Sequence, residues 1–590
     1  MHKNAHSYNF CANFMQNLLI LCALTASFGK IILPLQPNFL RFVIKDMKKF
    51  KSCIVGLLLT ATSTTAIAGG ILTNTNQSID FLRNPARDAA IGLDGVYSNP
   101  AGVAFMPKGF HLGINWQYAH QTRTITSTNE LFKLGAKNGG NDTKTFKGIA
   151  NAPFVPSVQA AWNTGNWSFQ FNFSIPGGGG KCEFADGLGS FETAVGAIAT
   201  GLQQTSNDLN QLTNLFGSSV PNVTGYDADG YMKGRQYYFG FQLGAAYKIN
   251  EHLSVYGGVR VLYGSATYEA RLNNIKVMNG SEGITLPKYF EEVKTGLTKA
   301  GVNLATTGPA PYVAAVASKL IAAGVPAAEA TAQATTTVTK AADKLQSLAD
   351  PNSELNASAE KLAPYANGMN LKSDQSGVGV APVLGIDYKI GAFNFAAKYE
   401  FKTRMRMKNN STLKEAVIDV TKKYEDGTTV PEDAPALLAV GAQWSIIDNV
   451  RVNLGYHHFF DKQAHWYNHS EKLLSCGTNE FLLGAEWDII KKLTVSAGGQ
   501  ITRYGLTDEY MNDMSFVVNS WNFGVGLNYQ VAKHVKLKAA YFQTNYGTYD
   551  MNTPVQTLAS IGETNITVPA GHNSFTRTNN VFGLGVDLNF

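Results

Sequence analysis

The last residues of the chain alternate strictly between large apolar side chains and glycine or polar residues. The apolar members are Phe582, Leu584, Val586, Leu588 and Phe590. Side chains of a β-strand point to opposite faces in turn, so this segment has one apolar and one polar face. Such a strand faces either lipid, in a membrane barrel, or the core of a soluble sandwich.

The same alternation recurs along most of the chain. Fourteen segments fit it, an even number as in bacterial single-chain barrels. They are residues 108–125, 154–163, 166–176, 234–249, 252–272, 376–390, 393–408, 434–447, 449–465, 478–489, 493–504, 516–531, 534–547 and 577–590. Short connections alternate with long ones, which predicts short periplasmic turns, long outer loops and both barrel ends on the periplasmic side.

Nothing after the N-terminal region is apolar for the roughly eighteen residues that a membrane helix needs. A chain without such helices spans a membrane only as a closed barrel, in which every backbone group is paired. An export signal and the terminal Phe590, which we expect the barrel-assembly machinery to read, argue against a soluble sandwich. The sequence therefore predicts an all-β fold, a 14-stranded antiparallel transmembrane β-barrel of the bacterial outer membrane.

The first 68 residues contain a secretory signal. Met47 opens a positively charged stretch followed by an apolar run, and Ala66-Ile67-Ala68 fits a cleavage motif. The mature chain is therefore expected to begin near Gly69, and the residues before Met47 are interpreted as sequence upstream of the true start. Residues 1–68 hold seven of the 49 Lys and Arg and one of the 43 Asp and Glu, which leaves 42 of each. This balance predicts no nucleic-acid partner.

Reactive residues are sparse in the mature chain. Cys182 and Cys476 are its two cysteines, and pairing is as well supported as two free thiols. The sequence contains none of the common hydrolase, zinc-protease, phosphate-binding or C-x-x-C motifs, so we expect no enzyme and no cofactor. His457, His458, His465 and His469 lie in strand and loop, where their spacing does not converge on a metal; no metal site is predicted.

Three stretches resemble the FadL/TodX family of outer-membrane transporters for long-chain fatty acids and aromatic hydrocarbons. Residues 241–263 look like its fourth and fifth strands, and residues 376–399 contain pieces similar to its sixth and seventh. Asn99-Pro100-Ala101 resembles a motif of the family's N-terminal plug. The order and spacing of these pieces carry the resemblance, because no single one is highly specific.

The resemblance implies a domain organisation. Residues 69–107 would be a plug or hatch inside the barrel, around Asn99, Pro100 and Ala101, and residues 108–590 the barrel itself. From the residues alone, 69–107 are only too polar to span lipid and equally fit a periplasmic tail. The outer loops 184–232 and 273–375 are longer than the family leads us to expect.

The third expected strand meets an unusual sequence at its end. It runs into Pro176, Gly177, Gly178, Gly179 and Gly180. Proline lacks a ladder donor and glycine weakens strands. Two interpretations carry equal weight: the strand simply ends at the proline, or it is kinked and leaves an opening in the wall. The resemblance implies the second, because a kink in this strand gives the family its lateral exit.

Two outer loops have helical patterns. Phe191, Val195, Ile198 and Leu202 recur at helical spacing, and residues 312–348 are rich in alanine. Packing on the barrel rim accounts for most such residues, and a ligand-capturing groove is the functional alternative.

The resemblance implies a function as well. We expect a monomer that passively takes up long-chain fatty acids or other hydrophobic compounds and releases them laterally into outer-membrane lipid. An adhesin, or a binding barrel without transport, is the alternative.

Overall fold

The computed structural model describes residues 73–366, 368–414, 423–561 and 564–590. The expected signal peptide in 1–68 and the cleavage near Gly69 lie outside these residues. Strands dominate the described part, and fourteen of them form one closed antiparallel ring, as predicted. In ring order they are β1 (Gly109–Thr128), β2 (Thr143–Thr164), β3 (Trp167–Phe184), β4 (Gly225–Lys248), β5 (Leu253–Asn279), β7 (Met369–Ile390), β8 (Phe393–Glu400), β11 (Leu437–Ile447), β12 (Val450–Phe459), β13 (Asn479–Ile490), β14 (Leu493–Arg503), β15 (Ser520–Ala532), β16 (Val535–Tyr546) and β20 (Gly571–Asn589).

The ring closes between its first and last strands. β1 and β20 pair without interruption from His111 opposite Asn589 to Thr128 opposite His572. Phe110 and Phe590 exchange backbone hydrogen bonds of 3.1 and 2.9 Å below this ladder. The sheet therefore leaves no free edge along these two strands, as a membrane barrel requires.

The alternation of the sequence corresponds to the two faces of the wall. The large apolar side chains of β20, such as Phe582 and Leu584, are about half exposed on the outer surface, whereas Asp587 on the alternate face is buried. Four of the five exposed tryptophans in the described ranges lie close to the short turns, as in the aromatic girdles of membrane barrels, and the fifth, Trp521, lies at the outer start of β15. The four near the turns are Trp162, Trp167, Trp444 and Trp487.

Several strands run further than the sequence predicted. β2 begins at Thr143 rather than 154, and β4 begins at Gly225 rather than 234. These polar extensions project beyond the part of the wall that carries the apolar alternation. The expected strand 393–408 is instead broken after Glu400, and β9 then pairs with β7. The shorter strands are β6 (Glu282–Thr285), β9 (Arg406–Lys414), β10 (Thr429–Pro431), β17 (Tyr549–Thr553), β18 (Gln556–Ile561) and β19 (Thr564–Val568).

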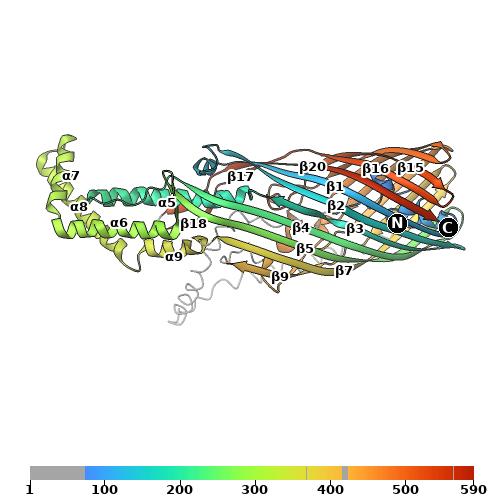
Figure 1. Ribbon diagram of the computed structural model, residues 1–590, viewed down its shortest axis with the longest axis horizontal. Coiled ribbons are helices and arrows are strands. Elements are labelled where there is room, and N and C mark those ends of the chain that lie inside the picture. The colour runs from blue at the N-terminus through green and yellow to red at the C-terminus, as the bar shows by residue number, and fades with distance from the viewer. Residues whose placement is uncertain (1–72, 367, 415–422, 562–563) are drawn as a thin grey trace, which may run out of the picture. The chain divides into compact units, whose positions relative to one another are not determined.

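Both enlarged loops are helical, as predicted, and lie at the end of the molecule with the long connections (Figure 1). The helix expected around Phe191 is α5, and its apolar face belongs to the largest buried cluster of the protein. No helix in the described ranges is long and apolar enough to cross a membrane. The longer helices are α5 (Gly189–Leu215), α6 (Leu286–Thr307), α7 (Ala310–Ala322), α8 (Ala327–Ala349) and α9 (Glu354–Ala366).

Residues 73–107, the N-terminal segment, contact the inward faces of strands from all around the ring. The segment contains α4 (Ile79–Arg83), η1 (Leu93–Val96) and η2 (Gly102–Phe105). Glycines of the wall make room for it: a Cβ on Gly524 would lie 1.9 Å from the carbonyl oxygen of Leu82. The glycines that alternate with apolar residues in the sequence thus allow close packing inside the barrel.

Candidate functional site

The wall of the barrel has a break between β2 and β3. Their ladder runs from Thr164 opposite Trp167 to Val158 opposite Phe173, and resumes only at Ala150 opposite Cys182. Residues 151–157 of β2 and 174–181 of β3 therefore form no ladder pairs with each other; we call this region the β2–β3 gap. β3 continues through it to Phe184, so the interpretation that the strand ends at Pro176 is wrong.

Prolines stand on both sides of the β2–β3 gap. Pro153 and Pro156 lie on the β2 side and Pro176 on the β3 side. Each removes one backbone donor that a continuous ladder would need. Pro176 was predicted from the sequence, but the two prolines of β2 were missed, although Pro156 lies inside the expected strand 154–163 and Pro153 directly before it.

The glycines after Pro176 produce the bend of β3. Its pairing with β4 shifts register twice, between Ser174 and Gly177 and again between Gly177 and Gly180. Gly178 has a φ of +106°, and a Cβ there would lie 2.2 Å from the carbonyl oxygen of Gln236. This conformation is open to glycine and excluded for other residues by the neighbouring backbone.

The beginning of the N-terminal segment covers the gap from inside. Gln77 accepts a 2.9 Å hydrogen bond from the Ile175 N–H and donates a 3.1 Å bond to the Ile175 carbonyl. The Asn74 N–H donates to the Pro176 carbonyl at 2.9 Å, and the Asn74 amide donates to the Gly178 carbonyl at 3.1 Å. Backbone groups that β2 leaves unpaired thus find partners in the N-terminal segment, which makes a break in the wall tolerable.

A cavity of about 130 Å³ lies against the gap on the inner side. Amides and phenols dominate its lining, so it is not the apolar pocket expected of a transporter for hydrophobic compounds. Gap residues from both strands contribute to it, as do the N-terminal segment, β1 and β20. The polar side chains of its lining include Gln77, Gln121, Tyr504, Tyr546, Arg577 and Asn579.

The three residues Asn99, Pro100 and Ala101 each contact a different strand. The Asn99 amide donates to a carboxylate oxygen of Asp387 in β7 at 2.6 Å. The Pro100 carbonyl accepts from Gln170 in β3 at 2.7 Å, and the Ala101 carbonyl accepts from Ser254 in β5 at 2.7 Å. The tripeptide therefore connects the N-terminal segment to three separate parts of the wall.

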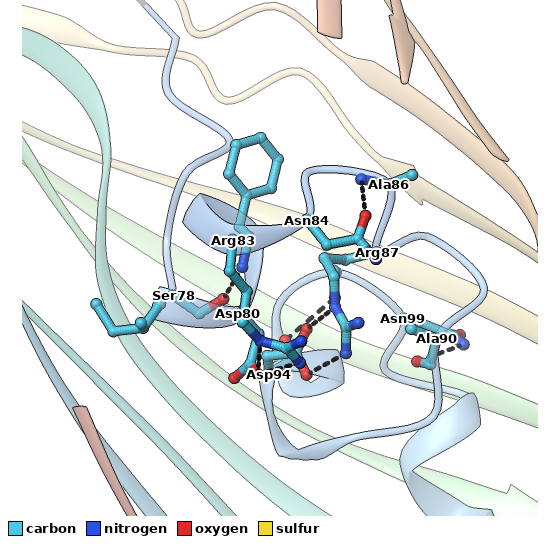
Figure 2. Close-up of polar contacts among 12 residues, drawn as sticks. Ser78, Asp80, Arg83, Asn84, Ala86, Arg87, Ala90, Asp94 and Asn99 are labelled. Carbon is cyan, nitrogen blue, oxygen red and sulfur yellow. Dashed lines mark hydrogen bonds and ion pairs between the residues drawn. The ribbon is translucent and has the colours of Figure 1, made fainter. Parts of the chain in front are cut away.

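Buried ion pairs hold the rest of the segment (Figure 2). Arg87 contacts Asp94 in a bidentate manner at 2.8 and 2.9 Å, and both Arg87 and Arg83 reach Glu486 of β13, at 2.9 and 2.7 Å. Arg83 also pairs with Asp80 at 2.8 Å. All five side chains are at most 6% exposed, so removing one partner would leave a charge buried without compensation.

Asp80 completes this network toward the far wall. Its carboxylate also pairs with Lys538 of β16, which in turn pairs with Asp587 of β20 at 2.6 Å. Burial alone would raise the pKa of Asp80, but the charges of Lys538 and Arg83 outweigh burial and hold that pKa well below its usual range. Asp80 is therefore an anionic anchor at neutral pH.

A second cavity lies at the outer end, beneath α5. Ser127, Ser190, Asp513 and Met551 contribute to its lining. Ile125 and Phe575, both fully buried and opposite one another on β1 and β20, lie in the large apolar cluster of the outer end. Along β1, Ile125 lies between residues of this outer cavity and residues of the cavity at the gap.

The cysteines do not pair in the structure. Cys182 is a buried free thiol in β3 beside the gap, and Cys476 is an exposed free thiol.

His457 lies between Asp88 and Glu480, at 2.8 Å from each, and belongs to the ion-pair network of the N-terminal segment. His465 and His469 stack on each other at the outer end. Within the described ranges, no three His, Cys, Asp or Glu side chains are grouped to hold a metal ion.

Comparison with known proteins is informative at the level of structure. No family model matches the sequence, and no curated protein does. A Pseudomonas aeruginosa FadL homologue is similar over 88% of this chain and 100% of its own, with a TM-score of 0.52 at 11% identity. The Ralstonia pickettii toluene transporter TbuX aligns over 87% of this chain and 98% of its own, with a TM-score of 0.44 at 13% identity. The closed ring of fourteen strands, the segment inside it and the similarity to the FadL homologue together show that the chain has the FadL-type fold.

Proposed function

We propose that the chain is a passive outer-membrane transporter for hydrophobic compounds that leave laterally through the β2–β3 gap. The observation that carries the proposal is the gap itself, which adjoins an inner cavity and is covered by the N-terminal segment. A wall opening bordered by three prolines and a bend that demands glycine serves no purpose in a barrel that only has to be stable. The similarity of the fold to the FadL homologue supports a barrel of this kind.

In this scheme the N-terminal segment is a plug. Its ion pairs and the contacts of Asn99, Pro100 and Ala101 fix it in the lumen. Only its first residues, around Asn74 and Gln77, hydrogen-bond to the bend of β3. Movement of this short part alone would open the gap, and ligand would then diffuse down its gradient into lipid. The scheme needs no nucleotide, metal or catalytic group.

The gap is tested by restoring the missing donors. Pro153, Pro156 and Pro176 are replaced together by Thr, while Gly178 is kept because a side chain there would collide with the backbone of β4. Uptake of a labelled long-chain fatty acid should fall, while heat-modifiable gel migration still reports a folded barrel. Pro382→Thr in β7, away from the gap, is the matched control. Normal uptake by the folded triple variant would refute lateral release.

An adhesin remains the second candidate. Its support is the helical outer region, where Val302 of α6 and Ile321 of α7 are 58% and 47% exposed. Deleting residues 310–349, which contain α7 and α8, distinguishes the two functions. An adhesin would lose attachment to cells or surfaces and keep any uptake, whereas a transporter would lose no attachment.

A further inference from the structure

Two arginines face each other across the closing seam of the barrel. Arg123 of β1 lies directly opposite Arg577 of β20 in the ladder. Both positions follow the alternation of inward residues, with Gln121 and Ile125 on one strand and Phe575 and Asn579 on the other. Side chains so paired have Cβ atoms about 5 Å apart, and like charges there are destabilising.

Neither arginine has an acidic partner among the described residues. Seven Lys and Arg side chains there are buried: Arg83, Arg87, Arg260, Lys398, Lys423, Lys538 and Arg577. The first six pair with a carboxylate. Arg577 is 7% exposed and makes one weak contact, at 3.3 Å, with the Gln121 amide oxygen, and its guanidinium carbon lies 5.1 Å from the Tyr546 ring centre. The Nε atoms of both Arg577 and Arg123 are buried without any hydrogen-bond partner.

No carboxylate stands among the groups that act most strongly on Arg123. These ionisable groups are Arg577, Cys182, Tyr546 and Tyr268. A buried cation without a counterion costs several kcal/mol by order of magnitude. The barrel compensates every other buried cation that the structure describes, so this exception indicates a place reserved for an external anion.

The position of the pair suits an amphiphile rather than a free ion. Arg577 forms part of the cavity at the gap. One inward residue further out, Ile125 and Phe575 present an apolar layer below the outer cavity. An acyl chain entering from the outer cavity would have to displace this buried layer to bring its head to the guanidinium groups. Paired arginines are well suited to a carboxylate, which accepts hydrogen bonds from both at once.

We infer that Arg123 and Arg577 form a binding site for the carboxylate of an acidic amphiphile, so that the chain selects fatty-acid-like molecules over neutral hydrocarbons. The inference rests on the proposed transport function and narrows its substrate class. It also accounts for the polar lining of the inner cavity, because a carboxylate head needs amide and phenol neighbours where a hydrocarbon needs none.

The test compares two probes with the same chain and different heads. Labelled oleate and oleyl alcohol are bound at equilibrium to the full-length mature protein in non-ionic detergent. The wild type should bind oleate at least about tenfold more tightly, the difference expected from one charge-assisted contact. Arg577→Gln and Arg123→Gln should each reduce oleate affinity to that of the alcohol and leave alcohol affinity unchanged. Arg577→Lys should restore part of the preference.

Arg235→Gln is the matched control, because Arg235 is an exposed arginine of β4 with one hydrogen bond to Thr267. A second measurement separates a binding role from a structural one: without ligand, Arg577→Gln should melt no lower than the wild type, since it relieves a like-charge pair. Equal binding of both probes to the wild type, or unchanged oleate affinity in both Gln variants, would overturn the arginine site alone. Failure of the wild type to bind either probe would overturn the transport function together with it.

Discussion

Gln77 satisfies both backbone groups of Ile175, accepting from its N–H at 2.9 Å and donating to its carbonyl at 3.1 Å. The two residues are 98 positions apart, one near the start of the inner segment and one at the bend of β3. The glutamine side chain makes the two hydrogen bonds that the backbone of a neighbouring strand makes elsewhere in the wall. The opening and its cover are therefore parts of one hydrogen-bonded unit.

Gln77→Ala should loosen this cover. The substitution leaves the Ile175 N–H and carbonyl unpaired in a buried position, at about 1–3 kcal/mol for each group. We expect faster uptake of a labelled fatty acid by cells, with the barrel still folded, because the plug no longer holds the gap shut. Gln204→Ala, at an exposed position of α5, is the control and should change nothing. Uptake equal to that of the wild type would mean that Gln77 has no gating role.

Exchanging the partners Asn99 and Asp387 tests the hatch. Asn99→Asp places two carboxylates where the structure has a 2.6 Å amide–carboxylate hydrogen bond, and repulsion should push the segment away from β7. Planar-bilayer conductance should rise well above that of the wild type. Adding Asp387→Asn restores one amide and one carboxylate and should restore the low conductance. A double variant as leaky as the single one would show that the pair does not act by this contact.

Acid should release the N-terminal segment only at low pH. The pKa of Asp80 in the folded protein lies below its unfolded value of 3.8, because Lys538 and Arg83 outweigh the effect of burial. The stabilisation from this carboxylate is therefore complete above the unfolded pKa and is lost as pH falls through the folded pKa. Conductance should stay low from neutral pH to about pH 4 and rise below it. Asp80→Asn should raise conductance already at neutral pH. A leak in the wild type well above pH 4 would contradict this assignment.

The sequence predicted the wall well and the contacts across the lumen poorly. Alternation of apolar and polar residues is a local pattern. Strands such as the one ending at Phe590, and the faces of these strands, could therefore be predicted from this two-residue period alone. The outer extension of β2 from Thr143 to Pro153 could not, because it is mostly polar and lacks the apolar stripe. The break after Glu400 was missed for a related reason. The alternation of side chains continues past Glu400, but β8 pairs with β11 whereas β9 pairs with β10.

The candidate site was only partly predictable. Pro176 and the glycines after it were visible because they violate strand preferences. Gln77 carried no signal, since a glutamine in a polar segment is unremarkable until the fold places it beside Ile175. The opposition of Arg123 and Arg577 was in principle derivable, because a closed ring fixes the register of its first and last strands. It requires the exact pairing of Phe110 with Phe590, and sequence-based strand ends are uncertain by a few residues.

The two cysteines should differ in reactivity. Cys476 is exposed and Cys182 is buried beside the gap, and neither forms a disulfide in the structure. A membrane-impermeant maleimide added to intact cells should label Cys476 and leave Cys182 unmodified until the protein is denatured. Cys476→Ser should therefore abolish labelling of the native protein. A mobility shift on reduction, or protection of both thiols, would indicate pairing after all.

The bend of β3 should depend on Gly178 much more than on Gly180. Both have positive φ, +106° and +71°, but a Cβ at 178 would meet the Gln236 carbonyl oxygen at 2.2 Å, whereas at 180 the nearest atom is 3.8 Å away. Gly180→Ala should therefore lower the free energy of unfolding by the backbone strain alone, about 1–3 kcal/mol. Gly178→Ala adds a collision with the backbone of β4, which cannot rotate away as a side chain can. Either β4 must therefore move, or the irregular pairing of β3 with β4 must form in another register.

The free energy of unfolding in urea, followed by heat-modifiable migration, should fall most for Gly178→Ala and less for Gly180→Ala. Gly257→Ala, on β5 with open space around its Cβ and no positive φ, should stay close to the wild type. If the bend forms the exit, Gly178→Ala should also lower fatty-acid uptake per folded molecule, because a straightened β3 approaches β2 and narrows the gap. Equal stability of the two alanine variants at 178 and 180 would show that β3 can bend without a glycine at 178.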